Sequence, residues 1–459
     1  MLHIIHTNDL HGHIENWPIL RTFMEEKIAH YLAEGDPYLL VDIGDALDSV
    51  NPMVEASKGQ IMIDLFNQIG YDVVTIGNNE GLNFTSTQLS KLYDKANFDI
   101  TIANLLSSQT QDVPEWGQKV VFKQVGAYKL AFIGLTAPYA TYPLNGYEIL
   151  NPIRTLKAIV KKLQKDPSID LIVLMSHLGI EQDRYIAKIL PEIQLIIGAH
   201  THHVLFEGEW VNQTLLTAAG RYGLYIGEID FDYDPQLKQW YFQARVLTLK
   251  QVQERLESPV PSENYIEEGR YLLAQETVTH SSRPYFALQL QSENSYIQMA
   301  LDALAWYANC PLAILNSGLF LSDLPAGRIN QNDLHESLPH PMHLARVTLK
   351  GSQLITMLNE MEGQREDLSY KMIHGLGFRG KIFGELVYRG LTYDQSQDLW
   401  LTQGQPIQSK ETYELITVDH LWFLPFFPSM EANGLPQLIF PDFIRHVVAK
   451  YLKYMNETK

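Results

Sequence analysis

Short apolar segments alternate with amphipathic segments from residue 1 to about residue 250, and this alternation most constrains the fold. The apolar runs predict strands, and the segments with apolar residues at helical spacing predict helices. The predicted strands are 2–8, 38–43, 72–76, 99–104, 128–135, 169–175 and 194–198. The predicted helices lie near 18–33, 59–69, 85–96, 152–164 and 181–190. This rhythm indicates an α/β fold in which helices pack on the outer faces of sheets.

A change of character after residue 250 marks the end of this first region. Pro259 and Pro261 would break any helix that ran into them, and a charged helix is expected over 267–276. A second α+β region follows, with helices at 292–308, 351–361 and 440–454 and strands near 312–315, 343–349, 384–389 and 413–418. Because 459 residues are too many for one core, we expect domains at 1–250 and 281–459, joined by a connecting segment and helix at 251–280.

Composition excludes several classes of protein. The chain is 46% hydrophobic and 19% charged, as is usual for a globular protein. Its net charge of −18 argues against a nucleic-acid partner, because phosphate backbones need clustered lysine and arginine. Cys310 is the single cysteine, so an intrachain disulfide and a thiolate metal cluster are both excluded. No apolar run could span a bilayer, and no signal peptide precedes the first strand, so we expect a cytoplasmic protein without a membrane partner. The oligomeric state stays open.

Polar residues follow five of the predicted strands directly. The first strand is followed by Asp9 and His11, which would project to the same side of an extended backbone. Taken singly, this pair could simply decorate a strand-to-loop exit. Four later strand ends carry similar groups: Asp42-Ile43-Gly44-Asp45, Gly77-Asn78-Asn79-Glu80, Ser176-His177 and Gly198-Ala199-His200-Thr201-His202. Ligand sites in α/β sheets lie outside the carboxyl ends of the strands, so the five together predict a metal site built from carboxylate, amide and imidazole groups.

The order of these motifs resembles that of the calcineurin-like metallophosphoesterases, which have Asp-x-His, Gly-Asp, Gly-Asn-His-Asp/Glu, a single histidine and Gly-His-x-His. Here Ala199 is inserted before the last pair. The opening His6-Thr7-Asn8-Asp9-Leu10-His11 and the downstream region look more specifically like the bacterial 5′-nucleotidase family. The resemblance implies a four-layer α/β/β/α sandwich followed by a smaller α+β substrate-binding domain.

The resemblance also implies two divalent metal ions and their ligands. Asp9, His11 and His202 would hold one ion, Asn78, His177 and His200 the other, and Asp45 would bridge them. These ligands suit Mn²⁺, Zn²⁺ or Fe without selecting among them. A hydroxide that bridges the two ions would attack the phosphorus in line. The implied activity is hydrolysis of a nucleotide or a related small phosphate ester.

The sequence departs from the family at one catalytic position. Asn79 stands where the family has a histidine that faces the phosphate, and Leu82 stands where an aspartate orients that histidine. The Asn79 amide can donate a hydrogen bond but cannot supply a proton. We therefore expect efficient hydrolysis of esters with good leaving groups and poor hydrolysis of alkyl monoesters.

The second domain departs further from the family pattern. Asn316 and Gly318 match part of an Asn-x-Gly-Gly-x-Arg substrate segment, but Leu321 replaces its arginine. In the glycine-rich segment 374–380, Phe378 aligns with an aromatic residue that stacks on the base, and Arg379 could contact phosphate. The second stacking residue would be His420 or Trp422. Each of these aromatic residues could equally belong to the core.

Two other functions remain open on the sequence. One is a phosphodiesterase or pyrophosphohydrolase that cleaves a cyclic nucleotide or a nucleotide sugar at the same site. The other is a nucleotide-binding sensor with little turnover, since the histidine–aspartate pair expected at positions 79 and 82 is missing. The presence of all seven metal-ligand positions favours an enzyme over a sensor.

Overall fold

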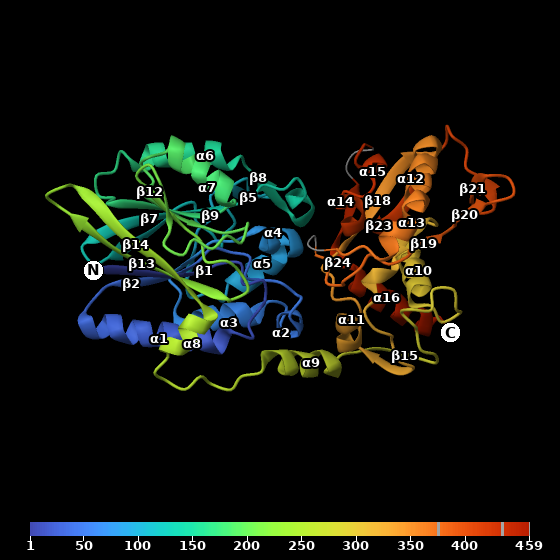
Figure 1. The fold of residues 1–459 in the computed structure, drawn as a ribbon, viewed down its shortest axis with the longest axis horizontal. Coiled ribbons are helices and arrows are strands. Elements are labelled where there is room, and N and C mark those ends of the chain that lie inside the picture. The colour runs from blue at the N-terminus through green and yellow to red at the C-terminus, as the bar shows by residue number, and fades with distance from the viewer. Residues whose placement is uncertain (374–376, 433–435, 459) are drawn as a thin grey trace. The chain divides into compact units, whose positions relative to one another are not determined.

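The computed structural model describes residues 1–373, 377–432 and 436–458. The chain folds as two compact units, Met1–Gly269 and Arg270–Lys459. Each unit has its own apolar core, and each is described separately below (Figure 1).

The first unit contains two six-stranded sheets. The first sheet has the order β14 (Gln239–Thr248), β13 (Tyr225–Asp234), β1 (Leu2–Thr7), β2 (Tyr38–Asp42), β3 (Val73–Val74) and β4 (Asp99–Ile100). The second has the order β11 (Glu209–Val211), β12 (Thr214–Thr217), β10 (Leu195–Gly198), β9 (Leu171–His177), β7 (Tyr128–Thr136) and β6 (Val121–Val125). Strands β1 to β4 are parallel, as are β7, β9, β10 and β12. Within each sheet, the carboxyl ends of the parallel strands therefore lie along one edge.

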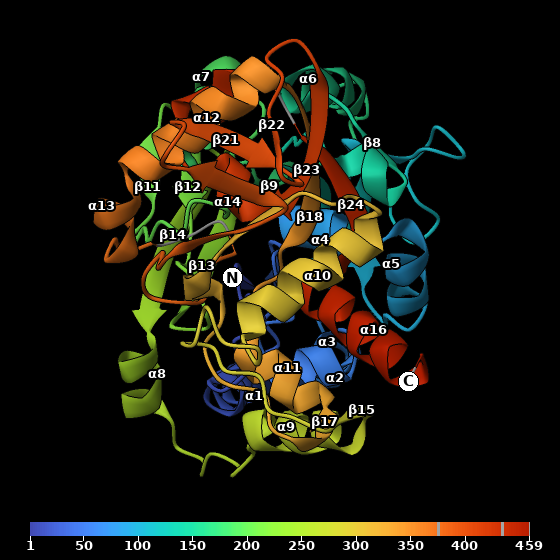
Figure 2. The same cartoon turned by 90° about the vertical axis from the view of Figure 1, so that its right-hand side faces the viewer.

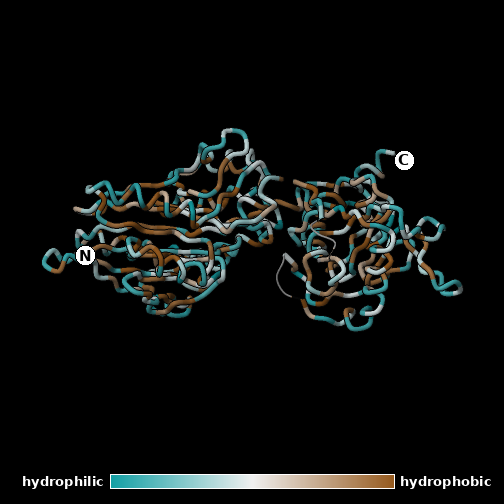
Figure 3. Tube along the Cα trace, turned by 90° about the horizontal axis from the view of Figure 1, so that it is seen from above, coloured by the Kyte–Doolittle hydropathy of each residue, from teal (hydrophilic) through white to brown (hydrophobic). Residues whose placement is uncertain are grey.

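Helices cover the outer face of each sheet. Helices α1 (Trp17–Glu34), α3 (Gln60–Ile69) and α5 (Ser86–Tyr93) pack on the first sheet, and α6 (Pro152–Leu163) and α7 (Ile180–Ile189) pack on the second (Figure 1). Neighbouring residues of β1 show the layering, since Ile4 faces the core between the sheets and Ile5 faces the core under α1. Strands buried on both faces read as continuous apolar runs, and these form the brown central layers in Figure 3. The predicted four-layer α/β/β/α sandwich is confirmed.

Shorter elements complete the first unit. They are α2 (Pro52–Ala56), α4 (Asn78–Asn83), β5 (Leu105–Ser107), η1 (Tyr142–Asn145), β8 (Tyr147–Ile149) and α8 (Leu249–Arg255). Helix α9 (Tyr265–Gln275) begins in this unit and continues past its end at Gly269. The segment that follows β14 packs back on this unit: Val252 is fully buried, and Arg21 Nη2 donates a 2.8 Å hydrogen bond to Glu263 Oε1. The first unit consequently extends through most of the segment that we expected to be a connector.

The second unit is built around a five-stranded sheet with the order β19 (Leu386–Arg389), β16 (Ala313–Asn316), β23 (Thr412–Val418), β18 (His343–Lys350) and β24 (Gln437–Phe443). Two smaller sheets are β15 (Thr277–Ser281) with β17 (Gly327–Asn330), and β20 (Leu391–Asp394), β21 (Leu399–Thr402) and β22 (Gln405–Pro406). The main helices are α10 (Tyr296–Ala308), α12 (Gly351–Gly363) and α16 (Ile444–Glu457). The shorter ones are η2 (Ser317–Leu319), α11 (Gln331–Ser337), α13 (Arg365–Ser369), α14 (Asp419–Phe423) and α15 (Pro428–Ala432). Helices α10 and α16 lie side by side in Figure 2.

The start of the last helix differs from the prediction. The helix expected over 440–454 begins at Ile444, because residues 440–443 complete β24, where Phe443 pairs with His343 of β18. Apolar residues at 440 and 443 fit either element, so their spacing could not locate the boundary. Across the described parts of the chain, no helix combines the length and apolar character needed to cross a membrane.

Candidate metal centre

The seven predicted metal ligands converge at the carboxyl ends of strands in the first unit. Asp9 and His11 follow β1, Asp45 follows β2, Asn78 opens α4 after β3, His177 ends β9, and His200 and His202 follow β10. Two groups of ligand atoms form there, Asp9 with His11 and His202, and Asp45 with His177 and His200. Within each group, the ligand atoms all lie within 4.8 Å of one another. The first group is the set that the family resemblance implies for one ion. The second contains His177 and His200, which the resemblance implies for the other ion, together with Asp45, while the place of Asn78 as a ligand stays a prediction.

Tight turns, and not an extended backbone, bring these side chains together. Five ligands have a positive φ: Asp9 (51°), His11 (48°), Asp45 (52°), His200 (74°) and His202 (56°). Our expectation that Asp9 and His11 project from an extended segment therefore differs from the structure. Left-handed conformations are uncommon outside glycine and persist only where their surroundings hold them. Main-chain hydrogen bonds from Asp9 N to Gly44 O (3.0 Å) and from His11 N to Asp45 O (2.7 Å) provide that support.

The two groups share a single electrostatic environment. Asp45 Oδ2 lies 3.3 Å from His177 Nε2 and 3.7 Å from His11 Nε2, and Asp9 Oδ1 lies 3.5 Å from His202 Nε2. Burial disfavours the charged form of Asp45, but His177 and His11 hold its pKa below the ordinary value. Burial acts in the same way on Asp9, whose pKa is nevertheless lowered by His11 and His202. Both carboxylates are thus ionised and able to bind cations.

Two buried atoms at the second group suit a metal ion. Among the described residues, Asn78 Oδ1 and His177 Nε2 are both buried and have no hydrogen-bond partner. His177 Nε2 faces Asp45 at 3.3 Å without hydrogen-bond geometry, while its Nδ1 donates to Ile43 O at 2.7 Å. That second contact orients the imidazole so that the Nε2 lone pair points into the site. Unpaired buried polar atoms are costly, and a divalent cation would satisfy both.

Glu80 organises the two loops that carry Asp45 and Asn78, a role that the sequence analysis did not identify. Its buried carboxylate accepts hydrogen bonds from the main-chain N–H groups of Asp45, Ala46, Leu47 and Gly77 at 2.8–3.1 Å. Burial and the charge of Asp45 raise the pKa of Glu80 to about 7. Its place three residues after Gly77, at N3 of α4, was the available signal.

Two glycines allow these loops to touch. A Cβ on Gly44 would lie 2.1 Å from Gly77 N, and a Cβ on Gly77 would lie 2.1 Å from Asp45 Oδ1. Gly44 also has a φ of 88°. Gly77 is needed for the close approach alone, since its φ is −90°.

Asn79 contacts one member of each ligand group. Its main-chain N donates to Asp45 Oδ1 at 2.7 Å, and its side-chain Nδ2 lies 2.9 Å from His11 Nδ1. Leu82, in contrast, packs partly buried against the apolar core that includes α1 and α3. Asn79 therefore supports the ligands directly, whereas the side chain of Leu82 contributes apolar packing.

Asn8 holds Asp9 in place, a second role that the sequence analysis did not assign. Its Nδ2 donates to Asp9 Oδ2 (2.9 Å) and to Gly220 O (2.8 Å), and its Oδ1 accepts from Ala219 N (3.0 Å). The side chain is buried and fully bonded. Asn8 was visible in the opening motif, but nothing local to β1 revealed the partner segment more than 200 residues away.

In the second unit, the ring of Phe378 is itself the centre of a stack. The ring of His340 lies nearly parallel to it with a centroid distance of 5.2 Å, and the ring of His420 lies nearly parallel to it at 5.0 Å. A Cβ on Gly380 would come within 2.6 Å of the ring edge. The side chain is 5% exposed. That Phe378 stacks on a base, with His420 or Trp422 on the other side, stays a prediction, and in the structure the ring already stacks on two imidazoles.

Asn316, Gly318 and Trp422, three other predicted substrate contacts, are held by main-chain hydrogen bonds or by the core. Asn316 Nδ2 donates to Phe383 O at 2.7 Å, and Gly318 N donates to the same oxygen at 2.9 Å. Arg379 N donates to His340 Nδ1 at 3.0 Å. Trp422 belongs to the core of the unit. Residues 374–376 of the glycine-rich segment lie outside the described residues.

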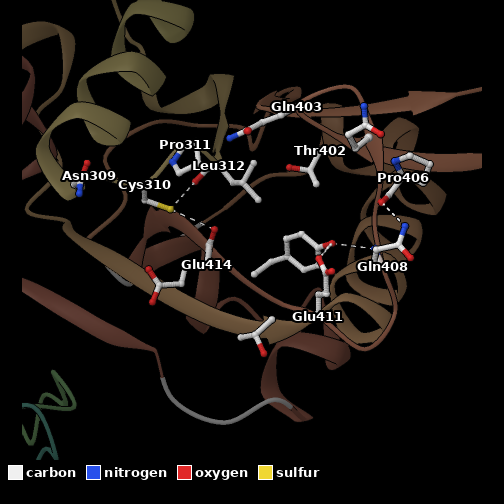
Figure 4. Close-up of a pocket in the computed structure, with 13 residues that line it drawn as sticks. Asn309, Cys310, Pro311, Leu312, Thr402, Gln403, Pro406, Gln408, Glu411 and Glu414 are labelled. Carbon is white, nitrogen blue, oxygen red and sulfur yellow. Dashed lines mark hydrogen bonds between the residues drawn. The ribbon is translucent and has the colours of Figure 1, made fainter.

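A hollow of about 590 Å³ lies elsewhere in the second unit, between β22, the start of β23 and the residues before β16 (Figure 4). Cys310 borders it and donates its thiol to Glu414 O at 3.3 Å. The residues described around it include the carboxylates of Glu411 and Glu414 but no lysine or arginine. This lining disfavours a phosphate group.

The sequence matches two families of known proteins. Residues 2–204 match the calcineurin-like phosphoesterases, and residues 277–422 match the 5′-nucleotidase C-terminal domain. The first match lies within the first compact unit, and the second match lies within the second.

Individual relatives resemble the chain over most of its length. An uncharacterised metallophosphoesterase, YunD of Bacillus subtilis (strain 168), is 30% identical over 465 residues and covers 98% of each chain. A 5′-nucleotidase of Vibrio cholerae is 23% identical, covering 78% of this chain and 75% of the relative. The solved structure of the Haemophilus influenzae NAD nucleotidase has a similar fold, with a TM-score of 0.60 at 16% identity over 99% of this chain and 96% of that one.

Proposed function

Because the chain belongs to the metallophosphoesterase family, in the group that carries a 5′-nucleotidase C-terminal domain, we propose that it hydrolyses a nucleotide or a related small phosphate ester at a dinuclear metal centre. Members of this family are metal-dependent phosphoester hydrolases, and the structure contains two candidate metal-binding clusters. The identity of the substrate, the identity of the metal ions and the roles of individual residues belong to this proposal.

The observation that carries the proposal is the buried His177 Nε2, which has no hydrogen-bond partner among the described residues and lies 3.3 Å from the carboxylate of Asp45. The buried Oδ1 of Asn78 likewise has no partner there, and the main chain of the next residue, Asn79, donates to Asp45. Mn²⁺, Zn²⁺ or Fe would fit such a ligand set. Two such ions supply Lewis acidity and an activated water near neutral pH. Asp45 Oδ2 lies within 3.7 Å of histidines from both groups, which supports the bridging role that the family resemblance implies for it.

Asn79 and Asn8 would hold the side chains of the metal ligands in position during turnover. Asn79 ties Asp45 to His11, and Asn8 ties Asp9 to the main chain of Gly220. Neither amide can protonate a departing alkoxide. General acid assistance is typically worth about 10²–10⁴-fold, so esters whose leaving group needs no proton should be the best substrates.

The proposal is tested by stripping the protein of metal, reloading it with Mn²⁺, Zn²⁺ or Fe²⁺, and measuring kcat for aryl phosphates of graded leaving-group pKa. A panel of mono-, di-, cyclic and sugar nucleotides is measured alongside. We expect activity that requires added metal and a steep dependence on leaving-group pKa. If nucleoside monophosphates react as fast as aryl phosphates, another residue supplies the acid. If a metal-loaded protein cleaves no phosphate ester, the proposed activity is wrong.

A further inference from the structure

The segment Gly220–Gly223 passes beside the metal centre in an unusual backbone conformation. Gly220, Tyr222 and Gly223 all have a positive φ, between 61° and 63°. A bulky residue such as tyrosine rarely adopts that region. Tyr222 N donates to Asp9 O at 2.9 Å, and Gly220 N donates to His203 O at 2.9 Å. The segment is therefore anchored to both ligand-bearing turns, those that follow β1 and β10.

Side-chain contacts fix the same segment from a second direction. The ring of Tyr222 lies 5.7 Å from that of His11 and 4.1 Å from that of His13. Asn8 Nδ2 donates to Gly220 O. A Cβ on Gly220 would come within 2.5 Å of the ring of Tyr225, so only glycine fits there. The position of residue 221 is thus set by several independent contacts.

Arg221 carries its guanidinium to the edge of the metal centre. Nη1 lies 3.2 Å from His202 Nδ1, and the guanidinium carbon lies 4.5 Å above the ring of Tyr222. The side chain is exposed, while Asp9 and Asp45 are buried. A permanent positive charge therefore stands at the solvent side of a buried, negatively charged cluster. In a chain of net charge −18, such a local cation would help an anionic substrate to approach.

The contact between Arg221 and His202 cannot persist when His202 binds a metal through Nε2. A neutral imidazole that ligates through one nitrogen carries its proton on the other. His202 Nδ1 would then be a donor facing the guanidinium, which has only donors. Arg221 would lose that acceptor, and it would stay over Tyr222 with its N–H groups available to an anion.

The ring of His202 separates Arg221 from the ligand atoms of the cluster. A phosphoryl group bound at the metal centre would therefore lie beside the guanidinium, and Arg221 could not take the place of a metal ion in binding it. The guanidinium could instead reach a second group that is attached to this phosphoryl group. Arginine binds phosphate and carboxylate oxygens in pairs through its planar fork.

We propose that Arg221 is a specificity-determining residue that binds a second anionic group of the substrate, next to the phosphoryl group that is transferred. The preferred substrates are then phosphate compounds with two adjacent anionic groups, such as diphosphates. This inference rests on the proposed function, because it places the transferred phosphoryl group at the metal centre.

The test is calorimetric binding to the full-length, Mn²⁺-loaded protein, with Mn²⁺ in excess of the probe, and it needs no turnover. The probes are inorganic phosphate and methylenediphosphonate, which cannot be hydrolysed. We expect Arg221→Ala to weaken methylenediphosphonate binding about 10- to 100-fold, the range for a charged hydrogen bond, and phosphate binding less than about threefold. Arg221→Lys should retain part of the difference. Arg154→Ala, on the exposed face of α6, is the control for loss of one positive charge and should change neither constant.

Metal content is measured for each variant. Equal weakening for both probes, no weakening for methylenediphosphonate, or loss of Mn²⁺ from Arg221→Ala would overturn the inference. The proposed function fails by a different outcome: if the wild type binds methylenediphosphonate through Arg221 but cleaves no phosphate ester, the binding role stands and the hydrolase role does not.

Discussion

Each unit holds a buried histidine with a distinct environment: His177 of the first unit faces a carboxylate, whereas His340 of the second unit stacks on a phenyl ring. In the first unit, His177 Nε2 points at Asp45 from 3.3 Å, and among the described residues it has no hydrogen-bond partner. In the second, His340 donates through Nε2 to Leu319 O at 2.7 Å and accepts from Arg379 N through Nδ1. Its ring then stacks on Phe378.

The difference shows up in the direction of the pKa shifts. Burial alone lowers the pKa of a histidine, and it lowers that of His340 to about 3. Burial acts on His177 too, but Asp45 and Asp9 outweigh it and raise the pKa to about 10. The carboxylates around His177 therefore favour positive charge at this position, which a bound metal ion would supply. The first cluster therefore has the electrostatics of a metal centre, whereas His340 and Phe378 form part of a packed core.

The largest effect is expected from removing the negative charge of Asp45, the proposed bridging ligand. Asp45→Asn should lower both metal content and turnover, the latter by about 10³-fold, because loss of one preorganised electrostatic contact already costs about 10²–10³-fold. His203→Ala, an exposed histidine just past the ligand pair, should leave both unchanged. Retention of two metals per chain in Asp45→Asn would exclude the bridging assignment.

The next prediction tests whether Phe378 packs in the core of the second unit or stacks on a base of the substrate. Phe378→Ala should reduce the free energy of unfolding by about 3–5 kcal/mol, the usual cost of a buried phenylalanine, and should change kcat/KM equally for aryl phosphates and nucleotides. Phe423→Ala, which is 41% exposed on α14, is the matched control and should cost far less. A selective rise in KM for nucleotides would show that a base does stack on this ring.

A smaller effect is expected at Asn79. Asn79→Ala removes the amide beside His11 Nδ1 while the main-chain bond to Asp45 can remain, so metal affinity should fall about 10- to 100-fold, as for other residues that orient ligands. Asn83→Ala, at the other end of α4, should not change it. Unaltered metal affinity together with a changed leaving-group dependence would instead place Asn79 on the substrate.

The smallest predicted effect is a pH dependence from His340. Its pKa is lowered when the protein is folded, so the stability it contributes is complete above its unfolded pKa of about 6.5. This stability is lost as the pH falls toward 3, because His340 binds a proton in the unfolded chain but stays neutral in the folded protein. Between pH 7 and pH 5 the loss should be about 2 kcal/mol. Denaturant titrations of His340→Gln should show a shallower pH dependence than wild type, and those of the exposed His30→Gln should not.

The first unit was predictable from its sequence to a large extent. Its strands are buried on both faces, so β1, β2, β7, β9 and β10 appear as largely apolar runs. Four of them, β1, β2, β9 and β10, end at or just before a predicted metal ligand. The helix α4 was missed because it is short and polar, and Glu80, which holds it in place, bonds to a loop about 35 residues earlier. In the second unit, spacing alone could not tell whether Phe378 lines a pocket or fills one.

The sequence by itself determined the order of the strands and helices in the first unit and the identity of the polar residues at each strand end. Those features follow from local hydrophobic pattern and residue chemistry. Only the tertiary structure decided how the ligands meet, through left-handed turns at Asp9, His11 and Asp45 that main-chain hydrogen bonds between distant segments hold in place. It also decided that Arg221 lies beside His202 and that Phe378 stacks on His340 and His420. Such contacts depend on segments far apart in the chain, and no local pattern encodes them.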